Sequence, residues 1–349
     1  MRKVLLLQGT IPKYRVPIYN ELARNVELTV VYSYGEAPEN AVFKPLYVPV
    51  KQFHYRVHMK NLYLLAQKYD VVICMDDNSY LYFRWLHRLP RKYKIIFWGI
   101  GVSAGYNERF DQNQDDIGRR RKRIENADAM LFYSEYPVEK YSRLGVSREK
   151  MFVANNTVYV QPIATQKKDI LLFVGSLYKQ KKIDILLESY LQAYKINPEI
   201  YNLFIVGDGS ERETVERWIE QNGLKKKIFL TGAIFEDENL ANYFARAIAC
   251  ISPDQAGLSV LKSMGYGVPY ITHKDAITGG EIFNISHNEN GILLNDFNEL
   301  PSVILESQQN PAKYILLGEK AKQHYMKHRT VQQMAQGFLD AIGYVTREL

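Results

Sequence analysis

The stretch PDQAGLSVLKSMGYG, residues 253–267, changes character partway along its length. Its first part has turn-forming residues, among them Asp254 and Gly257. From Leu258 onward, apolar residues recur at a spacing of three to four, which predicts a helix. Two charged side chains interrupt the stretch, Asp254 at the turn and Lys262 about two helical turns later. The stretch therefore predicts a turn that leads into a helix N-terminus, with one acid and one base beside it.

Short apolar runs lie on both sides of this stretch, and segments with helical periodicity separate most of them. Strands that are apolar on both faces and alternate with helices indicate parallel sheets covered by helices on both sides. The alternation occurs twice, before and after a polar linker at residues 161–168. The predicted strands are 3–8, 27–32, 71–75, 94–98, 129–133, 151–154, 170–174, 201–206, 228–231, 247–252, 269–273 and 291–294.

We therefore expect an α/β chain with two doubly wound, Rossmann-like domains that face a cleft. A chain of 349 residues is long enough for two such domains. The first is expected at residues 1–163 and the second at 164–329, with a C-terminal helix at about 330–349 that packs back onto the first. In such sheets ligands bind at the carboxyl ends of the strands, so the residues that follow strands are the candidates for a site.

Three glycine-containing turns follow predicted strands in the second half of the chain. Gly175 and Gly207 each end a strand, and Gly257 precedes the helix described above. Glycine lets a backbone approach a ligand closely, and a helix N-terminus offers free N–H groups with partial positive charge. Together with Lys181, in a lysine-rich loop, these turns suit a diphosphate. Each turn alone is also compatible with a role that only shapes the chain.

The order of these motifs resembles the retaining glycosyltransferases of the GT-B fold, in particular family 4. That family has the pattern Val-Gly-Arg-Leu-x-x-x-Lys-Gly-x-Asp, then Gly-Asp-Gly-Pro-Glu, then Pro-Ser-x-x-Glu-Gly-Phe-Gly-Leu-x-x-Leu-Glu. This chain has VGSLYKQKKID at 174–184, GDGSE at 207–211, LTG at 230–232 and SPDQAGLSVLKSMGYGVPY at 252–270. The resemblance covers nearly all of the second half in the same order. In the first half, YRVPIYNEL at 14–22 and FWG at 97–99 look like the family's acceptor domain.

The resemblance implies sugar transfer from a nucleoside-diphosphate-sugar with retention of anomeric configuration. It implies that Lys181 contacts the donor diphosphate, that backbone N–H groups of Gly257 and Leu258 hold the distal phosphate, and that Asp254 engages sugar hydroxyls. Lys181 and Asp254 are the predicted catalytic residues. The rest of the predicted donor-binding set is Gly9, Thr10, Gly175, Ser176, Gly207, Gly232, Ala233, Ile234, Phe235 and Lys262, of which 233–235 would lie beside the nucleobase.

The predicted acceptor-binding residues come from the first half of the chain. They are Tyr14, Arg15, Asp76, Trp98 and Gly99. For Tyr14 and Arg15, a role in packing is the alternative. Asp76 and its neighbour Asp77 follow a strand, where an aspartate can instead cap a helix.

The chain departs from the family at two donor positions. Ser176 replaces an arginine, which removes a cation, and Lys262 replaces a glutamate that accepts hydrogen bonds from ribose hydroxyls. An ammonium group can only donate hydrogen bonds. We hypothesise that Lys262 supplies phosphate or ribose contacts that Ser176 does not. The alternative is a lysine that extends its ammonium to solvent on the flank of the helix.

Charge is distributed unevenly along the chain. Residues 1–165 hold 25 Lys and Arg against 16 Asp and Glu, so the first half accounts for the whole net charge of +7. This asymmetry indicates a surface that meets an anionic partner, for which we expect a membrane. The densest part is RRRKR at 119–123, where a solvated helix face is the alternative. The sequence has no recognisable nucleic-acid motif, so no nucleic acid is expected as a partner.

The remaining features concern compartment and cofactors. No apolar run is long enough to span a bilayer or to form a signal peptide. Cys74 and Cys250 have no metal-ligand spacing, and so few cysteines suit a reduced compartment. We expect a cytoplasmic enzyme of polysaccharide biosynthesis, peripheral on the inner face of a membrane. It would use a nucleotide-sugar co-substrate, a surface-glycan or lipid-linked oligosaccharide acceptor, no cofactor and no metal. The alternatives are a nucleotide-sugar epimerase on the same fold and a sugar-nucleotide-binding subunit that has lost turnover.

Overall fold

The structure of the protein, a computed structural model, describes residues 1–54, 56–76, 79–80, 86–105, 109–113, 117–164 and 166–347. Asp77 lies outside the described residues. The chain forms two compact units. Unit 1 comprises Met1–Ser103, Asp111–Tyr159 and Thr330–Leu349, and unit 2 comprises Ala104–Phe110 and Val160–Arg329. A short segment of the first half of the chain, Ala104–Phe110, therefore belongs to unit 2.

Unit 1 is built on a seven-stranded parallel sheet with the order β3-β2-β1-β6-β7-β8-β9. Strand β1 pairs with both β2 and β6, so the strand order reverses beside it, as in doubly wound folds. A separate antiparallel hairpin joins β4 to β5. The strands are β1 (Lys3–Leu7), β2 (Glu27–Tyr32), β3 (Lys44–Tyr47), β4 (Val50–Phe53), β5 (Arg56–Met59), β6 (Val71–Met75), β7 (Lys94–Gly99), β8 (Ala129–Phe132) and β9 (Met151–Val153).

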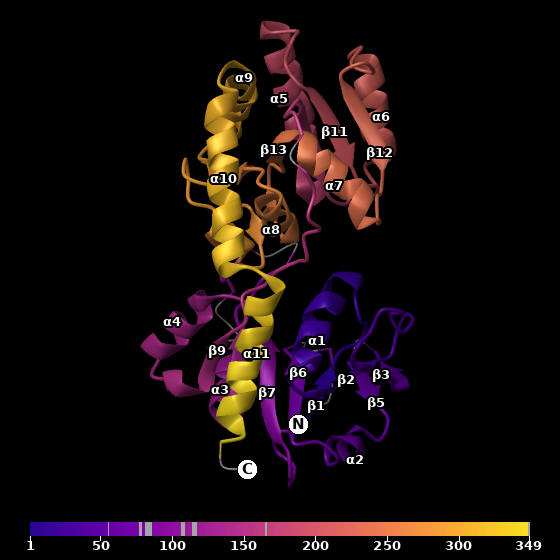
Figure 1. The fold of residues 1–349 in the computed structure, drawn as a ribbon, viewed down its shortest axis with the longest axis vertical. Coiled ribbons are helices and arrows are strands. Elements are labelled where there is room, and N and C mark those ends of the chain that lie inside the picture. Colours follow the sequence, from indigo (N-terminus) through magenta and orange to yellow (C-terminus); the bar gives the residue numbers. More distant parts are fainter. Residues whose placement is uncertain are drawn as a thin grey trace. The chain divides into compact units, whose positions relative to one another are not determined.

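Helices cover both faces of this sheet. On one face pack α1 (Val16–Ala23) and α11 (Val331–Val345), and the other face receives side chains of α2 (Leu62–Ala66), α3 (Ile117–Asn126) and α4 (Glu135–Arg143). Helix α11 lies across unit 1 near β7 and β9 (Figure 1), and its Phe338 packs edge-on against Trp98. A Cβ on Gly337 would lie 2.3 Å from the Val153 carbonyl oxygen, so a glycine is needed where α11 crosses β9.

Unit 2 is built on a six-stranded parallel sheet with the order β12-β11-β10-β13-β15-β17. Strand β10 lies between β11 and β13, so this sheet also reverses its strand order beside its first strand. A small parallel pair, β14 and β16, lies apart from it. The strands are β10 (Ile170–Val174), β11 (Asn202–Val206), β12 (Ile228–Gly232), β13 (Ala247–Ile251), β14 (Gln255–Ala256), β15 (Tyr270–His273), β16 (Ile277–Thr278) and β17 (Gly291–Leu294).

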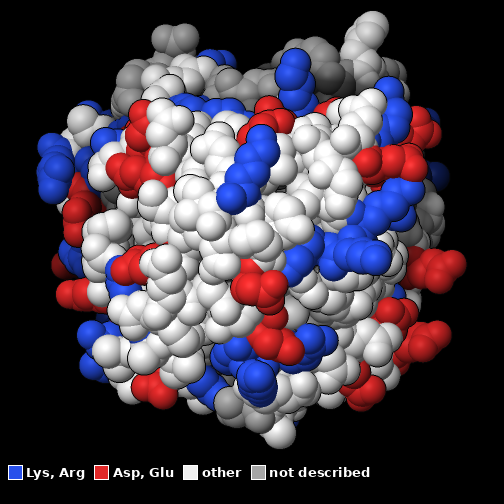
Figure 2. Space-filling model, turned by 90° about the horizontal axis from the view of Figure 1, so that it is seen from above, with Lys and Arg blue, Asp and Glu red and all other residues white. Residues whose placement is uncertain are grey.

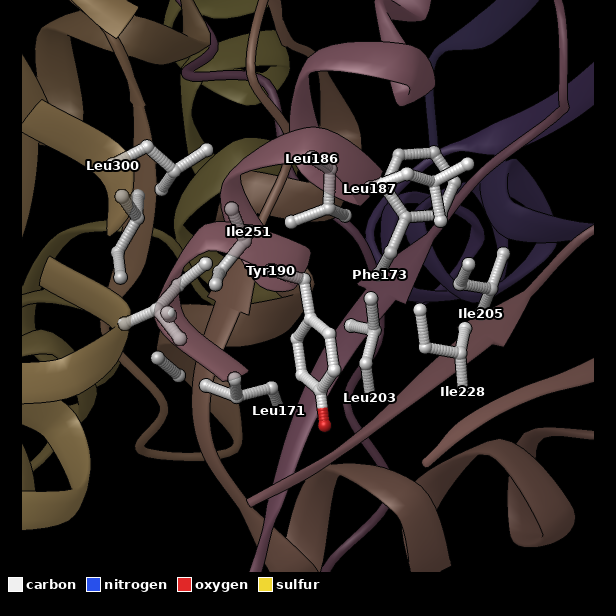
Figure 3. Close-up of a cluster of buried hydrophobic side chains, with 14 of the residues drawn as sticks. Leu171, Phe173, Leu186, Leu187, Tyr190, Leu203, Ile205, Ile228, Ile251 and Leu300 are labelled. Atoms are coloured by element: carbon white, nitrogen blue, oxygen red, sulfur yellow. The ribbon is translucent and has the colours of Figure 1, made fainter. Parts of the chain in front are cut away.

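The sheet of unit 2 is buried between two layers of helices. One layer consists of α5 (Ile183–Ile196), α6 (Arg212–Gln221) and α9 (Leu300–Gln309), and the other of α7 (Asp237–Arg246) and α8 (Leu258–Gly265). Helix α10 (Pro311–His328) contributes buried residues to the cores on both sides. Figure 3 shows the core on the first side, where Tyr190 of α5 points between Leu171 and Leu203 of the sheet. The described residues also form short 3-10 helices: η1 (Lys13–Arg15), η3 (Arg148–Lys150), η4 (Lys179–Lys181), η5 (Glu281–Asn284) and η6 (Phe297–Glu299).

The predicted α/β class with two doubly wound parallel sheets is confirmed. Each of the twelve predicted strands is present, and each of its ends lies within one residue of the prediction. The prediction missed β3, the β4–β5 hairpin and the short strands β14 and β16.

Candidate functional site

The candidate site lies at the carboxyl ends of the strands of unit 2. Because β10 to β13 run parallel, the residues that follow them meet at one edge of the sheet. This edge brings together most of the predicted donor-binding residues. They are Gly175 and Ser176 after β10, Gly207 after β11, Gly232, Ala233, Ile234 and Phe235 at the end of β12, and Asp254, Gly257 and Leu258 after β13.

The glycine turns after β10 and β11 are packed tightly against each other. A Cβ on Gly207 would lie 1.9 Å from the Gly175 carbonyl oxygen, and a Cβ on Gly209 would lie 2.3 Å from the Leu177 carbonyl oxygen. Backbone hydrogen bonds join the same loops, from Gly175 N–H to Val206 at 3.0 Å and from Leu177 N–H to the carbonyl of residue 208 at 2.9 Å. The close packing of the two loops therefore requires these glycines, independently of any contact with a ligand.

Lys181 places a buried cation at this edge. Its side chain comes from η4, and a Cβ on Gly175 would lie 3.0 Å from its Nζ. Burial lowers the pKa of the Lys181 ammonium from 10.5 to about 8. At pH 7 the group therefore carries its charge while having lost much of its hydration, a state that favours contact with an anion.

The N-terminus of α8 adds a second source of positive potential. Gly257 is its N-cap, and no side chain caps the helix there. The first N–H groups of a helix have no intrahelical partner and carry the positive end of the helix dipole. Gly257 has an ordinary φ of −103°, and a Cβ there would meet nothing within 4 Å. Backbone strain and packing therefore do not require this glycine, and its lack of a side chain leaves the helix N-terminus open.

Asp254 is a buried carboxylate with two cations beside it. Only 3% of the residue is exposed. Its Oδ2 lies 2.8 Å from Lys182 Nζ, and its Oδ1 lies 3.8 Å from a guanidinium nitrogen of Arg109. The carbonyl of Asp254 accepts a hydrogen bond from Ile277 N–H at 3.0 Å, which ties the turn to β16. A buried carboxylate is tolerated because cations compensate for its lost hydration.

The sequence motifs predicted no role for Lys182 or Arg109. Lys182 directly follows Lys181 in the lysine-rich loop, so its position in the sequence could have predicted that it lies near the site. Arg109 comes from the segment Ala104–Phe110, whose Phe110 packs edge-on against Phe283 with ring centroids 5.2 Å apart. No local pattern in the sequence connects this segment with Asp254.

Lys262 does not extend into solvent. Its Nζ donates to Asp237 Oδ1 at 2.5 Å, and its side chain is only 18% exposed. Asp237 lies in the first turn of α7, so this ion pair joins α8 to α7. Ser176, whose lost arginine motivated the hypothesis about Lys262, is exposed at the end of β10.

The segment predicted to lie beside a nucleobase follows β12. Ala233 is exposed and Phe235 is 78% exposed, whereas Ile234 is half-buried. Ile234 lines a cavity of about 490 Å³ beside α7. The other lining residues are Phe204, Glu236, Asn239, Asn242, Tyr243 and Arg246.

In unit 1, the predicted residues near β1 differ in their exposure. Thr10 is exposed, and a Cβ on Gly9 would lie 1.8 Å from the Tyr80 hydroxyl oxygen. Tyr14 is 40% exposed, but Arg15 is buried with its guanidinium over three rings. The rings belong to Tyr14, Trp98 and Tyr133, with centroids at 5.1, 4.9 and 5.2 Å. The burial of Arg15 favours the packing role for that residue, and Trp98 is buried as well. Tyr14 and Thr10 are exposed, so a ligand can reach them.

Asp76 forms a buried cluster with two arginines of α3. Arg123 pairs with its Oδ1, and Arg120 lies 3.5 Å from its Oδ2. Gly99 gives the cluster room, since a Cβ there would lie 2.9 Å from the Asp76 Cβ. The interpretation of RRRKR as a solvated face is therefore wrong for Arg120 and Arg123, whose spacing of three puts them on one side of the helix.

Other charges of unit 1 are also paired locally. Arg121 pairs with Glu125 within α3, and Lys140 pairs with Asp111 at 2.5 Å. Figure 2 looks onto unit 2, where Lys and Arg are likewise interspersed with Asp and Glu. Among the described residues, no group of three or more His, Cys, Asp or Glu side chains has the arrangement of a metal site. No helix within the described ranges has both the length and the apolar character needed to cross a bilayer.

Comparison with known sequences agrees with this geometry. Residues 159–300, which contain most of the candidate site, match the family model described as glycosyl transferases group 1. The chain is 23% identical over 283 residues to a poly(ribitol-phosphate) alpha-N-acetylglucosaminyltransferase of Staphylococcus aureus, an alignment that covers 78% of this chain and 55% of that protein. It is 26% identical over 202 residues to the GtfA subunit of a UDP-N-acetylglucosamine–peptide N-acetylglucosaminyltransferase of Limosilactobacillus reuteri, covering 58% of this chain and 35% of that subunit. The chain thus spans about half, or less, of the length of these relatives.

Solved structures resemble the whole chain. TarM superposes with a TM-score of 0.74 at 12% identity, over 98% of both chains. HepE from Anabaena, solved in complex with UDP, has a TM-score of 0.74 at 14% identity, over 98% of this chain and 99% of that chain. At these identities the likeness establishes the fold.

Together, the two parallel sheets, the motifs at the edge of the second sheet and the comparisons make one assignment: the chain has the GT-B fold, and its residues 159–300 match the family model of glycosyl transferases group 1.

Proposed function

We propose that this protein is a retaining, metal-independent glycosyltransferase that moves a sugar from a UDP-sugar to a surface-glycan or lipid-linked acceptor. The observation that carries the proposal is the edge of unit 2's sheet, where the Lys181 ammonium, the open N-terminus of α8 and the Asp254 carboxylate meet. The choice of UDP is supported by the solved complex of HepE with UDP. The relatives named above are transferases, and nothing among them supports an epimerase.

Each of these groups has a distinct task in the proposed reaction. As the bond between sugar and phosphate breaks, negative charge grows on the leaving diphosphate. The Lys181 ammonium is a fixed charge, and the N–H groups of Gly257 and Leu258 are fixed dipoles. They stabilise the growing negative charge on the diphosphate without having to move during the reaction. They supply the positive charge for which other transferases use a metal ion, which is why we propose a metal-independent reaction. Asp254 accepts hydrogen bonds from hydroxyls of the transferred sugar and orients it.

Retention of configuration without a covalent glycosyl–enzyme intermediate requires that the acceptor attack from the side of the leaving group. In the family that this chain resembles, the leaving phosphate itself takes the acceptor proton, so no side-chain base is needed. We propose the same arrangement here. Nuclear magnetic resonance of the first-formed product tests it, since an inverted anomeric centre contradicts retention.

A thermal-shift screen against UDP-, GDP-, ADP- and dTDP-sugars, in buffer with EDTA, tests donor binding directly. A ligand at 100 times its Kd stabilises the folded protein by about 2.7 kcal/mol. We expect at least one UDP-sugar to raise the Tm by several degrees. No shift with any nucleotide sugar, with or without Mg²⁺, contradicts the proposal and favours a subunit that has lost its donor site.

The pKa of Lys181 predicts a pH dependence of donor affinity. A bound diphosphate raises the pKa of the Lys181 ammonium above about 8, so the donor prefers the protonated form. Above pH 8 the free protein loses this proton, and the Kd for UDP should rise by up to about tenfold per pH unit. Calorimetric titrations at pH 7, 8 and 9 measure it. Lys181→Met should bind weakly at all three values, and a constant wild-type Kd contradicts the contact.

Lys262 is proposed to contribute to donor binding together with its partner Asp237. Lys262→Ala should weaken UDP-sugar binding by about tenfold or more, as expected for the loss of a charged hydrogen bond. Lys225→Ala is the matched control, because Lys225 pairs with Glu220 elsewhere on the surface of unit 2. An unchanged Kd in Lys262→Ala removes the hypothesis and leaves Lys262 as a residue that only joins α8 to α7.

The basic excess of the first half supports a proposal about the acceptor. We propose that unit 1 recruits the protein to an anionic membrane surface at which a lipid-linked acceptor is presented, with the enzyme on the cytoplasmic face. The pairs Arg120–Asp76, Arg123–Asp76 and Lys140–Asp111 reduce the charge available for this contact. Co-sedimentation measures this recruitment by comparing vesicles of neutral lipid with vesicles that also contain about 30 mol% anionic lipid. Equal recovery of the protein with the two kinds of vesicle contradicts the proposal.

A further inference from the structure

Lys182 has a backbone conformation that is unfavourable for its residue type. It is the N-cap of α5, with φ 49° and ψ 48°, in the left-handed region. A side chain in this region carries an energetic cost that glycine does not. The family pattern that this stretch resembles has a glycine at this position, directly after the lysine matched by Lys181. An unfavourable residue in a site suggests that its side chain has a task there.

The side chain of Lys182 is held by two contacts. Its Nζ lies 2.8 Å from Asp254 Oδ2 and 4.6 Å from the centroid of the Phe297 ring. The ammonium is therefore fixed between a carboxylate and an aromatic face, and the loop that carries it is joined to the turn after β13. Lys181, one residue earlier, points instead to Gly175 and the end of β10.

The two oxygens of Asp254 are in different situations. Oδ2 is paired with Lys182, whereas Oδ1 is buried and has no hydrogen-bond partner among the described residues. A guanidinium nitrogen of Arg109 lies 3.8 Å from Oδ1, too far for a hydrogen bond. A buried carboxylate oxygen without a donor is costly, and a ligand hydroxyl would satisfy it.

We propose that Lys182 is a positioning residue: by holding Oδ2 it keeps the Asp254 carboxylate turned so that Oδ1 accepts a hydroxyl of the transferred sugar. This inference rests on the proposed function, since it concerns the sugar of the donor. It assigns Lys182 to the sugar side of the site and Lys181 to the diphosphate side. Lys182 therefore acts on the rate of transfer through Asp254, and it contributes little to the binding of UDP itself.

The test uses three variants of Lys182 and a double-mutant cycle. Release of UDP from a UDP-sugar, with water as the acceptor, gives a rate that needs no glycan acceptor. Lys182→Met keeps the stem and the backbone cost but removes the charge, and Lys182→Gly removes both. Each should release UDP at least tenfold more slowly than the wild type, with the Kd for UDP changed by no more than about twofold. Lys182→Arg keeps the charge and should retain at least a third of the rate.

The cycle combines Lys182→Met with Asp254→Asn. If Lys182 acts through Asp254, adding Lys182→Met to Asp254→Asn slows the reaction by no more than about twofold further. A rate for Lys182→Met within threefold of the wild type overturns the inference. A tenfold higher Kd of Lys182→Met for UDP also overturns it, because that result indicates a direct contact with phosphate. So does a double variant in which Lys182→Met slows the Asp254→Asn protein as much as it slows the wild type. A wild-type protein that neither binds nor turns over any UDP-sugar is a different result, since it contradicts the proposed function.

Discussion

Replacing Asp254 with asparagine is expected to slow sugar transfer by about 100-fold or more. Asparagine has nearly the same shape and its amide oxygen can still accept from Lys182 Nζ, which lies 2.8 Å from the aspartate Oδ2. It lacks the negative charge that makes the buried carboxylate a strong acceptor for sugar hydroxyls. Removal of one preorganised electrostatic contact at a reacting centre lowers catalytic rates by about 10² to 10³.

The rate is measured as UDP release from the sugar donor that gives the largest thermal shift. Asp275→Asn is the matched control, because Asp275 lies in the loop after β15 with its side chain 61% exposed. Circular dichroism establishes that both variants are folded. A folded Asp254→Asn protein that releases UDP within threefold of the wild-type rate contradicts a role for Asp254 in the reaction.

Gly207→Ala is expected to destabilise the protein by about 3 kcal/mol or more. A Cβ at this position would lie 1.9 Å from the Gly175 oxygen and 2.9 Å from its carbonyl carbon, both backbone atoms that cannot rotate away. The turns after β10 and β11 would have to separate, which would break their mutual hydrogen bonds. Forced overpacking of this kind is among the largest single-residue effects on stability.

Urea unfolding followed by fluorescence measures the change in the free energy of unfolding. Gly257→Ala is the control, because its φ of −103° suits any residue and its Cβ would meet no atom within 4 Å. We expect its free energy of unfolding to stay within about 1 kcal/mol of the wild-type value. Equal stability of the two variants would mean that the loops of the site are not packed as described.

The strands of both sheets were predictable because parallel strands buried on both faces are continuous apolar runs. Val71–Met75 and Gly291–Leu294 have the predicted bounds for this reason. Strand β3 (Lys44–Tyr47) lies at the edge of the sheet and contains a proline and a lysine, and it gives no such signal. Strands β14 and β16 have two residues each, too few for any periodicity to appear.

The candidate site was predictable where its residues are local in sequence. Lys181, Gly207 and Gly257 each follow a strand or begin a helix, so strand prediction already placed them at one edge of a sheet. Contacts between distant segments were not predictable. Arg109 reaches Asp254 from the segment between β7 and α3, and one sequence gives no evidence that these residues meet.

The basic run in α3 illustrates the same limit in unit 1. Its charges predicted a surface for an anionic partner, but the carboxylate of Asp76 draws Arg120 and Arg123 inward. The spacing of the two arginines shows that they share a helix face. The sequence does not show that this face is turned toward Asp76, because that depends on how α3 packs on the sheet.

The central claim is that the edge of unit 2's sheet binds the diphosphate of a UDP-sugar, and calorimetric titration tests it most directly. At pH 7, UDP should bind wild-type protein with a Kd in or below the low millimolar range, uridine should bind at least tenfold more weakly, and Lys181→Met should lose at least tenfold in affinity for UDP. Equal affinities of the wild type for UDP and uridine, or equal affinities of wild type and Lys181→Met for UDP, would contradict the claim.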